Sequence, residues 1–385
     1  MTQKRPMGVA LLGLGTVGFG GYEFLSRRSD MEIVWALSQK VPQGVRCPIA
    51  ERIEQILSDP RVDTVIEVIG GLHPAYEWVS GALRAGKNVI TANKLLIARH
   101  YAELVTLALE RGVALRCTAA AGGGIPWLTS LKRCADQEPV IRVSGIMNGT
   151  TNYILDTMHR TGASFSDALS QAQRLGYAER DPADDLSGAD IRRKLVISSN
   201  IAYGCVIDEA EVATEGITHI TNADIAAFRR MGRVCRLLAA SRDLDGAVAA
   251  YIEPALVPPT MAESAVPDNN NLISLTGRHI GKQSFYGQGA GRYPTAYNVV
   301  QDCVDVLGGA RGFYTDRLRP LHVDNGSVRR SYYVRTGTVD KWLQARVDKL
   351  LDCGIMTKAV SVAEIHAWVK EHRAVDPACF IASVR

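Results

Sequence analysis

Short apolar runs alternate with longer mixed stretches along the first third of the chain. The apolar runs lie at residues 7–12, 31–37, 63–69, 88–91 and 113–117, and each has the length of a buried strand. Helices are predicted between them, at residues 16–27, 49–57, 74–85 and 98–111. Strands that alternate with helices predict a parallel sheet covered on both faces, which is an α/β fold.

The first predicted strand leads directly into the glycine-rich sequence GLGTVG, which opens the first predicted helix. In a dinucleotide-binding βαβ unit, Gly13 permits the tight turn, Gly15 lets the backbone approach a pyrophosphate, and Gly18 lets helix and strand pack closely. The N–H groups of the first helical turn, including those of Thr16 and Val17, favour an anion. We therefore predict that these residues bind a dinucleotide. An ordinary glycine turn is the alternative.

The residues after the second strand bear on which nicotinamide cofactor binds. A site for NAD usually ends this strand with Asp or Glu, which holds the ribose 2′-hydroxyl. This chain has Leu-Ser-Gln-Lys at residues 37–40 instead. Ser38 and Lys40 suit a 2′-phosphate better, so we predict NADP, with NAD as the alternative. A solvated loop position is an equally good explanation of Lys40.

Two later strands of the predicted sheet end in glycine or polar residues. Gly70 follows the third strand, and Asn93 and Lys94 follow the fourth. Ligands of parallel sheets bind beyond the carboxyl ends of the strands, so these residues are candidates for a binding site. A surface lysine at a strand end is the alternative for Lys94.

The composition narrows the class of protein. The chain has 385 residues, a formal charge of +4 and 46% hydrophobic residues, which suits two or three domains with a substantial core. Lys and Arg are scattered, so no nucleic-acid partner is expected. The cysteines form no CxxC pair, and neither a secretory signal nor a long apolar run is found. We therefore expect a cytoplasmic protein without a membrane partner.

Carboxylates are densest in the sequence LGYAERDPADDLSGADIRRKL. Proline and glycine interrupt it, so residues 179–187 are predicted to form a loop, and a helix with one buried face is predicted from Ala189. Asp190 and Lys194 are four residues apart on that helix and project from the same side. An ordinary surface ion pair is the alternative to a catalytic role.

A strand is predicted to turn into a helix within residues 144–155, SGIMNGTTNYIL. Asn148, Gly149 and Thr150 lie at this turn. A threonine here could cap the helix, and the free N–H groups of the first turn could receive a substrate carboxylate. The two roles are compatible, so both stay open.

Six motifs occur in this order: GLGTVG, TANK, GGGIP, GIMNGTTNYIL, LGYAERDPADDLSGADIRRKL and GQGAGRYPTA. In this combination the chain resembles the homoserine dehydrogenase family over roughly residues 9–305. The resemblance implies a Rossmann domain at 1–125, completed by about 290–310, with an inserted α/β catalytic and dimerisation domain at 126–289. It also implies a homodimer that interconverts L-homoserine and L-aspartate 4-semialdehyde with NAD(P), in threonine and methionine biosynthesis.

The resemblance implies that lysines handle a proton. The catalytic lysine of the family falls on Lys194, the lysine of its ANK motif on Lys94, and a substrate-side aspartate on Asp190. Hydride leaves the hydroxyl carbon of homoserine, so the hydroxyl proton must go to another group. A lysine can take it when burial or a neighbouring cation lowers its pKa, and Asp190 would orient Lys194.

A second set of residues would bind the substrate and the cofactor. The glutamate that binds the substrate amino group in the family falls on Glu179, and a further aspartate falls on Asp185. Two carboxylates suit the ammonium group of homoserine. The resemblance places the other substrate-side residues at Asn148, Gly149 and Thr150, and a residue near the nicotinamide at Gly289.

The chain departs from the family pattern at two places. A glutamate that helps to hold a monovalent cation in the family is Thr118 here, so we expect no metal, with Na⁺ or K⁺ held by main-chain carbonyls as the alternative. A proline of the family is Gln288 here, which leaves that turn less rigid. Two alternatives therefore stay open. One is a dehydrogenase of the same scaffold for another small amino-acid alcohol or aldehyde. The other is a catalytically silent NAD(P)-binding regulatory subunit.

Residues 331–385 predict a small C-terminal segment. Strands are predicted at 331–336, 357–362 and 378–384, and helices at 340–353 and 363–372. This order resembles a shortened ACT module, one strand short of the usual βαββαβ. An ACT module binds an amino-acid effector, whereas a degenerate one could add only a dimer contact or bind nothing.

Overall fold

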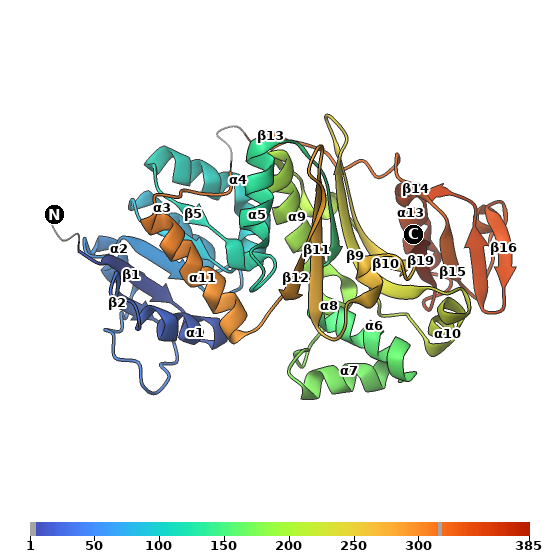
Figure 1. Cartoon of the computed structure of the whole chain (residues 1–385), viewed down its shortest axis with the longest axis horizontal. Helices are drawn as coiled ribbons and strands as arrows, with labels where there is room; N and C mark the ends of the chain where they lie inside the picture. The colour runs from blue at the N-terminus through green and yellow to red at the C-terminus, as the bar shows by residue number, and fades with distance from the viewer. Residues whose placement is uncertain (1–4, 315–317) are drawn as a thin grey trace. The chain divides into compact units, whose positions relative to one another are not determined.

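The computed structural model describes residues 5–314 and 318–385. Contacts group the chain into two units, each made of several segments (Figure 1). The first unit comprises Met1–Gln137, Asn200–Val206 and Gln288–Arg319, and the second comprises Glu138–Ser199, Ile207–Gly287 and Pro320–Arg385. Residues 126–137 thus group with the first unit, and residues 331–385 group with the second. The domain limits inferred from the sequence stay a prediction.

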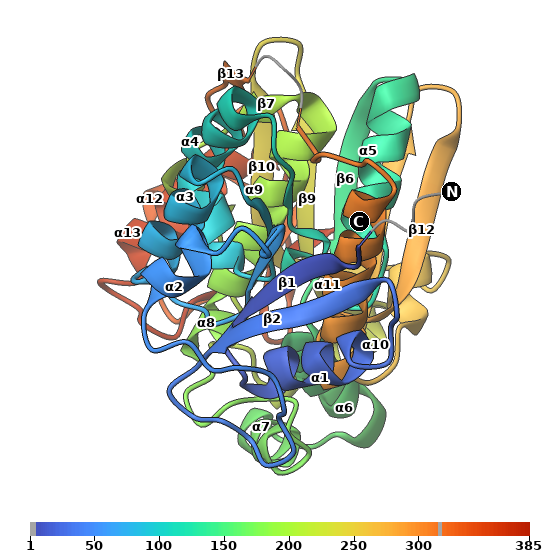
Figure 2. The same cartoon turned by 90° about the vertical axis from the view of Figure 1, so that its left-hand side faces the viewer.

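The first unit is built on a five-stranded parallel sheet. Its strands are β1 (Met7–Leu12), β2 (Met31–Leu37), β3 (Thr64–Glu67), β4 (Asn88–Thr91) and β5 (Leu115–Arg116). Its helices are α1 (Thr16–Leu25), α2 (Ile53–Ser58), α3 (Ala75–Arg84), α4 (Lys94–Arg111), α5 (Trp127–Gln137), α11 (Arg292–Leu307) and the 3₁₀ helix η1 (Thr118–Ala120). Helices α2, α3 and α4 lie on one face of the sheet, and α1 and α11 lie together on the other (Figure 2). Every residue of β1 is buried, as expected between two helical layers.

The strand order β2-β1-β3-β4-β5 creates a topological switch point. The chain leaves β1 for β2 and then returns to β3 on the other side of β1, so the carboxyl ends of β1 and β3 flank a crevice position. Gly13 follows β1 there, and Gly70 lies just beyond β3. The predicted Rossmann-type parallel sheet is therefore confirmed, and its topology places the glycine-rich loop where such sheets bind nucleotides.

The second unit is built on a long mixed sheet with the order β12-β11-β6-β9-β10-β19-β15-β17-β16, and β8 pairs with β10. These strands are β6 (Val140–Ile146), β8 (Ala213–Thr214), β9 (Val234–Asp243), β10 (Val248–Val257), β11 (Asn270–Gly277), β12 (Gly281–Gln288), β15 (Tyr332–Arg335), β16 (Val347–Leu351), β17 (Gly354–Thr357) and β19 (Phe380–Val384). Outside this sheet, β14 (Arg329–Arg330) pairs with β18 (Val360–Ser361), and β7 (Cys205–Val206), which groups with the first unit, pairs with β13 (Arg319–Pro320). The helices are α6 (Gly149–Thr161), α7 (Phe165–Arg174), α8 (Ala183–Ser187), α9 (Ala189–Tyr203), α10 (Asn222–Arg230), α12 (Lys341–Gln344), α13 (Val362–His372), η2 (Glu209–Glu211) and η3 (Ala262–Ala265).

The predicted loop at 179–187 is partly wrong, because α8 forms within it. Pro182 occupies the N-cap of α8, where the absence of an N–H group costs nothing. Gly188 ends the helix in a left-handed conformation with φ of 87°. The two residues that predicted a break therefore mark the two ends of one helical turn, and α9 follows at Ala189.

The predicted helix at 340–353 is wrong. Only α12 is helical there, and β16 and β17 follow as an antiparallel hairpin. β17 pairs with β15, which pairs with β19, so long-range pairing decides the conformation of this stretch. With α12 and α13, the four strands follow one another as βαββαβ, so the strand that the sequence lacked lies inside the predicted helix. An ACT-like role for this segment stays a prediction.

Candidate functional site

A buried ion pair lies in the first turns of α9. Lys194 Nζ donates to Asp190 Oδ2 at 2.6 Å and to the main-chain oxygen of Met147 at 2.9 Å. Only 9% of the Lys194 side chain and 6% of the Asp190 side chain are exposed. The alternative of an ordinary surface ion pair is therefore wrong. Because the pair is buried, removal of either partner would leave an uncompensated buried charge. Each side chain therefore depends on the other for its place in the interior.

Asn148 joins this ion pair to a second aspartate. Its Nδ2 donates to Asp190 Oδ2 at 2.9 Å and to Asp185 Oδ1 at 2.7 Å. Its Oδ1 accepts from the N–H group of Thr151 at 2.9 Å, so Asn148 caps α6. The cap is this asparagine and not a threonine. One side chain thus fixes the start of α6 and brings two carboxylates together.

Asp185 has an environment that disfavours its ionised form. Burial raises the pKa of this carboxyl above its ordinary value, and the charge of Asp190 raises it further, while the hydrogen bond from Asn148 opposes the rise. Asp185, Asp190 and Lys194 together carry a net negative charge when all are ionised. A positively charged ligand group is therefore favoured beside Asp185.

The remaining predicted substrate residues lie around α6 and the loop before α8. A Cβ atom on Gly149 would come within 2.5 Å of the main-chain oxygen of Asn269, so the close approach there requires glycine. The hydroxyl of Thr150 donates to the main-chain oxygen of Tyr177 at 2.6 Å. Glu179 is exposed, and its main-chain oxygen accepts a bond from a glutamine side chain. The role of the Glu179 carboxylate stays a prediction.

The glycine-rich loop of the first unit has the geometry of an anion site. Gly13 has a φ of 100°, and a Cβ atom on Gly18 would lie 2.0 Å from the Gly13 oxygen. A Cβ atom on Gly15 would meet nothing within 4 Å. In this part of the described chain no side chain caps the first turn of α1, which begins at Thr16 and continues with Val17. The loop therefore fits a cofactor pyrophosphate.

Ser38 connects the end of β2 to the glycine-rich loop. Its hydroxyl accepts from the N–H group of Leu14 at 3.2 Å and donates to the main-chain oxygen of Lys40 at 2.8 Å. Ser38 therefore shapes the loop, and Lys40 supplies an exposed cationic side chain two residues later. Of the two residues predicted to favour NADP, Lys40 is the better candidate for a phosphate contact.

A buried glutamate that the sequence analysis missed organises the ends of β3 and β4. Glu67 Oε1 accepts from the N–H groups of Ile69 and Gly70 at 2.9 and 3.2 Å, and Oε2 accepts from the Thr91 hydroxyl at 2.5 Å. Burial raises the pKa of Glu67. The available signal was a carboxylate inside the apolar run DTVIEVI, since a buried charge must find partners.

Asn93 lies beside this glutamate and begins α4. Its Oδ1 accepts from the N–H group of Leu96 at 3.1 Å, and its Nδ2 donates to the main-chain oxygen of Gly71 at 2.7 Å. Because of this cap, α4 begins at Lys94, four residues before the predicted start. Lys94 is half-buried at the first helical position, directly after the residue that links the two strand ends.

The glycine-rich segment at 119–126 packs against the backbone near Gly289. A Cβ atom on Gly123 would lie 2.4 Å from the carbonyl carbon of Gly289, and the N–H group of Gly124 donates to the Gln288 oxygen at 3.2 Å. The contact holds the turn before α11 although proline is absent from it. Gly289 groups with the first unit, and its role near the cofactor stays a prediction.

Thr118, at the position of the family's glutamate, takes part in a buried network. Its hydroxyl donates to Asp302 Oδ1 at 2.6 Å, and Arg116 Nε donates to the same oxygen at 2.9 Å. The network thus contains its own cation. Within residues 5–314 and 318–385, no group of three or more His, Cys, Asp or Glu side chains could hold a metal ion.

Among the helices of the same described residues, none combines the length and the hydropathy that a membrane span needs.

Comparison with known proteins assigns the chain to a family. One family model, described as homoserine dehydrogenase, matches residues 126–304. Another, described as the NAD binding domain of homoserine dehydrogenase, matches residues 13–117. A homoserine dehydrogenase of Synechocystis sp. is 36% identical over 316 residues, which cover 78% of this chain and 73% of that protein. The chain belongs to the homoserine dehydrogenase family.

Solved structures of homoserine dehydrogenases resemble this family member over almost its whole length. One from Thiobacillus denitrificans has a TM-score of 0.88 and 30% identity, covering 99% of this chain and 98% of that chain. One from S. aureus at pH 7.5 has a TM-score of 0.77 and 29% identity, covering 99% of each chain. The predicted family, fold and oxidoreductase class are confirmed, and the matched NAD-binding domain indicates a nicotinamide cofactor.

Proposed function

We propose that this homoserine dehydrogenase family member interconverts L-homoserine and L-aspartate 4-semialdehyde, with NADP preferred over NAD. The observation that carries the proposal is the buried Lys194–Asp190 pair, joined through Asn148 to Asp185. Family membership supports the reaction, and this group offers the charges that an amino-acid alcohol requires. When bound, the nicotinamide cofactor accepts or returns the hydride of the carbon that bears the hydroxyl.

The substrate is held by its two charged ends. The carboxylates of Asp185 and Glu179 accept hydrogen bonds from the ammonium group of the substrate. Its positive charge offsets the unfavourable burial of the Asp185 carboxylate. The start of α6, at Gly149 and Thr150, presents main-chain N–H groups and the positive end of a helix dipole, which suit the substrate carboxylate. Binding at both ends positions the hydroxyl group for reaction.

Lys194 handles the hydroxyl proton in the proposed mechanism. In the oxidising direction its neutral amine accepts the proton from the hydroxyl oxygen, and in the reducing direction its ammonium returns a proton to the aldehyde oxygen. Asp190 and the Met147 oxygen position Nζ through hydrogen bonds. Lys94, at the start of α4, is the second lysine that we propose for this proton.

A homodimer is also part of the proposal, and light scattering of the purified protein tests it.

Turnover tests the proposed reaction directly. The purified protein is mixed with L-homoserine and NADP or NAD, and formation of reduced nicotinamide is followed by its near-ultraviolet absorbance. Turnover with homoserine is the expected result. Turnover only with another amino-acid alcohol would favour the same-scaffold alternative, and cofactor binding without any turnover would favour the silent subunit.

The cofactor preference is tested at Lys40. Replacing this lysine by glutamine removes one charge-assisted contact of about 1.5–3 kcal/mol, so the dissociation constant for NADP is expected to rise about tenfold or more. The constant for NAD should stay unchanged because NAD lacks the 2′-phosphate. Lys349→Gln, at an exposed lysine of the second unit, is the matched control. Equal weakening of both cofactors would contradict the assignment.

A further inference from the structure

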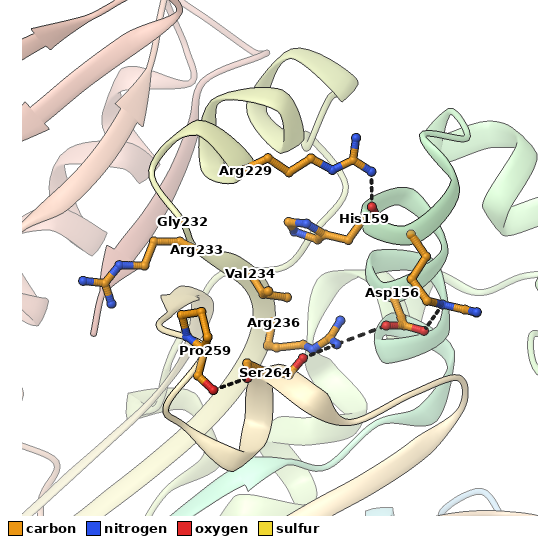
Figure 3. A pocket seen from close by; sticks show the side chains of 10 residues that line it. Asp156, His159, Arg229, Gly232, Arg233, Val234, Arg236, Pro259 and Ser264 are labelled. Carbon is orange, nitrogen blue, oxygen red and sulfur yellow. Dashed lines mark hydrogen bonds and ion pairs between the residues drawn. The ribbon is translucent and has the colours of Figure 1, made fainter.

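A cavity of about 390 Å³ lies in the second unit at the C-terminal end of α6 (Figure 3). The Asn148 cap lies at the other end of the same helix, the N-terminal end. The end of α6, the end of α10 with the residues after it, the start of β9 and residues near η3 form its walls. Its charged side chains are Asp156, Arg160, Arg229, Arg233 and Arg236. Neither the proposed reaction nor the proposed cofactor contacts use any of them.

Arg236 is the most deeply placed of these arginines, with only 2% of its side chain exposed. Its Nη2 donates to Asp156 Oδ1 at 3.1 Å and to the main-chain oxygens of Ser264 and Val266 at 3.0 Å each. Its Nε donates to the Glu263 oxygen at 3.1 Å. Its Nη1 is buried and has no hydrogen-bond partner among the described residues. A buried guanidinium nitrogen without an acceptor is costly, so Nη1 lacks an acceptor that an oxygen of a bound ligand could supply.

The negative charge within the cavity is already fully engaged. Asp156 is the only acidic lining residue in the described part of the cavity, and its Oδ1 accepts from Arg236. Its Oδ2 accepts from Arg160 Nε at 2.7 Å. The lining residues thus include one carboxylate and four arginines, of which Arg160 also pairs with Asp268, so the described lining carries a net positive charge.

His159 adds a neutral donor to this lining. The N–H group of Cys235 donates to His159 Nε2 at 2.9 Å, so in the neutral ring the proton lies on Nδ1. Burial, together with the charges of Arg236 and Arg229, lowers the pKa of His159 to about 4, so the ring is neutral at pH 7. Arg229 in turn donates to the main-chain oxygens of His159 and Met158 at the end of α6.

The donors are gathered on one part of the wall. In Figure 3, Arg229, His159, Asp156 and Arg236 lie one after another along one side of the cavity, whereas the guanidinium of Arg233 points away from them. Arg233 donates to the main-chain oxygen of Arg385 at 2.6 Å. Arg229, His159 and Arg236 are therefore the residues that an occupant of the cavity would contact.

We propose that this cavity binds a small polyanion, a metabolite that carries carboxylate or phosphate groups, at a site separate from the substrate and the cofactor. Guanidinium groups match the oxygens of both anion types, and several of them beside one another favour more than one negative charge. A zwitterionic amino acid fits less well, because its ammonium group needs a carboxylate and both oxygens of Asp156 are engaged.

Calorimetric titration of the full chain tests this site with two probes, inorganic phosphate and citrate. A saturating nicotinamide cofactor is present throughout, so that the glycine-rich loop is occupied and cannot bind the probe. The ionic strength is held constant, because charge-driven binding weakens with salt. We expect one site per chain for at least one probe. Phosphate binding alone favours a phosphorylated ligand, and citrate binding alone favours a carboxylate ligand.

Variants at Arg229 locate the bound probe. Arg229→Gln is expected to weaken binding about tenfold or more, and Arg229→Lys to weaken it less because the charge remains. Arg229 is exposed, so its replacement is safer for folding than replacement of Arg236, and circular dichroism confirms that the variants fold. Arg278→Gln, at an exposed arginine outside the cavity, is the matched control. No binding of either probe, or equal weakening in the control, would overturn the proposal.

Discussion

Replacing Lys194 by methionine tests whether this lysine moves the hydroxyl proton. Methionine fills much of the same space but cannot donate or accept a proton. Loss of a general acid or base lowers turnover by about 10²–10⁴-fold, so kcat is expected to fall by that amount. The variant also leaves the buried Asp190 without its cation, which costs about 3–5 kcal/mol of folding stability.

A double variant separates the loss of chemistry from the loss of stability. Lys194→Met combined with Asp190→Asn removes both buried charges, and replacement of a whole buried ion pair is often close to neutral for stability. We therefore expect the free energy of unfolding to recover in the double variant while kcat stays low. Urea denaturation measures stability, steady-state kinetics with homoserine measures kcat, and the quenching of protein fluorescence measures cofactor affinity.

Two results would refute this reasoning. A folded double variant whose kcat stays within about tenfold of the unmodified protein would show that Lys194 does not move the proton. A loss of cofactor affinity equal to the loss of kcat would show instead that the lysine has a structural role. Retained cofactor affinity with lost turnover is the pattern that the proposed mechanism requires.

Three further predictions concern the second unit. Burial raises the pKa of Asp185, so the ionised form that binds the ammonium group is lost as the pH falls, and KM for homoserine should rise in acid. Asp185→Asn should raise KM and remove its dependence on pH. Burial lowers the pKa of His159 from 6.5 to about 4, so the folded state binds fewer protons than the unfolded chain in that interval. Its contribution to stability is therefore complete above pH 6.5 and decreases by about 1 kcal/mol per pH unit as the pH falls from 6.5 to about 4. Urea denaturation should show a flatter pH profile of stability for His159→Gln. Asn148→Ala should lose about 0.5–2 kcal/mol of stability with the α6 cap and should also raise KM. Asn148→Ser, whose hydroxyl can still cap α6, should restore the stability but leave KM raised.

Much of the first unit follows from local sequence. Apolar runs separated by helical stretches predicted the parallel sheet, and GLGTVG predicted the turn between β1 and α1, because glycine alone tolerates the conformation and the close contacts there. The order of six motifs predicted the family. Helical spacing predicted that Asp190 and Lys194 share one side of α9, since that relation depends only on the geometry of one helix.

The tertiary structure decided whatever depends on partners distant in the chain. Residues 347–351 form a strand because β17 pairs with them and with β15, and no local pattern records that pairing. The bond from Asn148 to Asp185 spans 37 residues, and burial of the Lys194–Asp190 pair depends on everything packed around it. A sequence names the charged groups, but distance and exclusion of water set the strength of their interaction, and only the folded chain determines both.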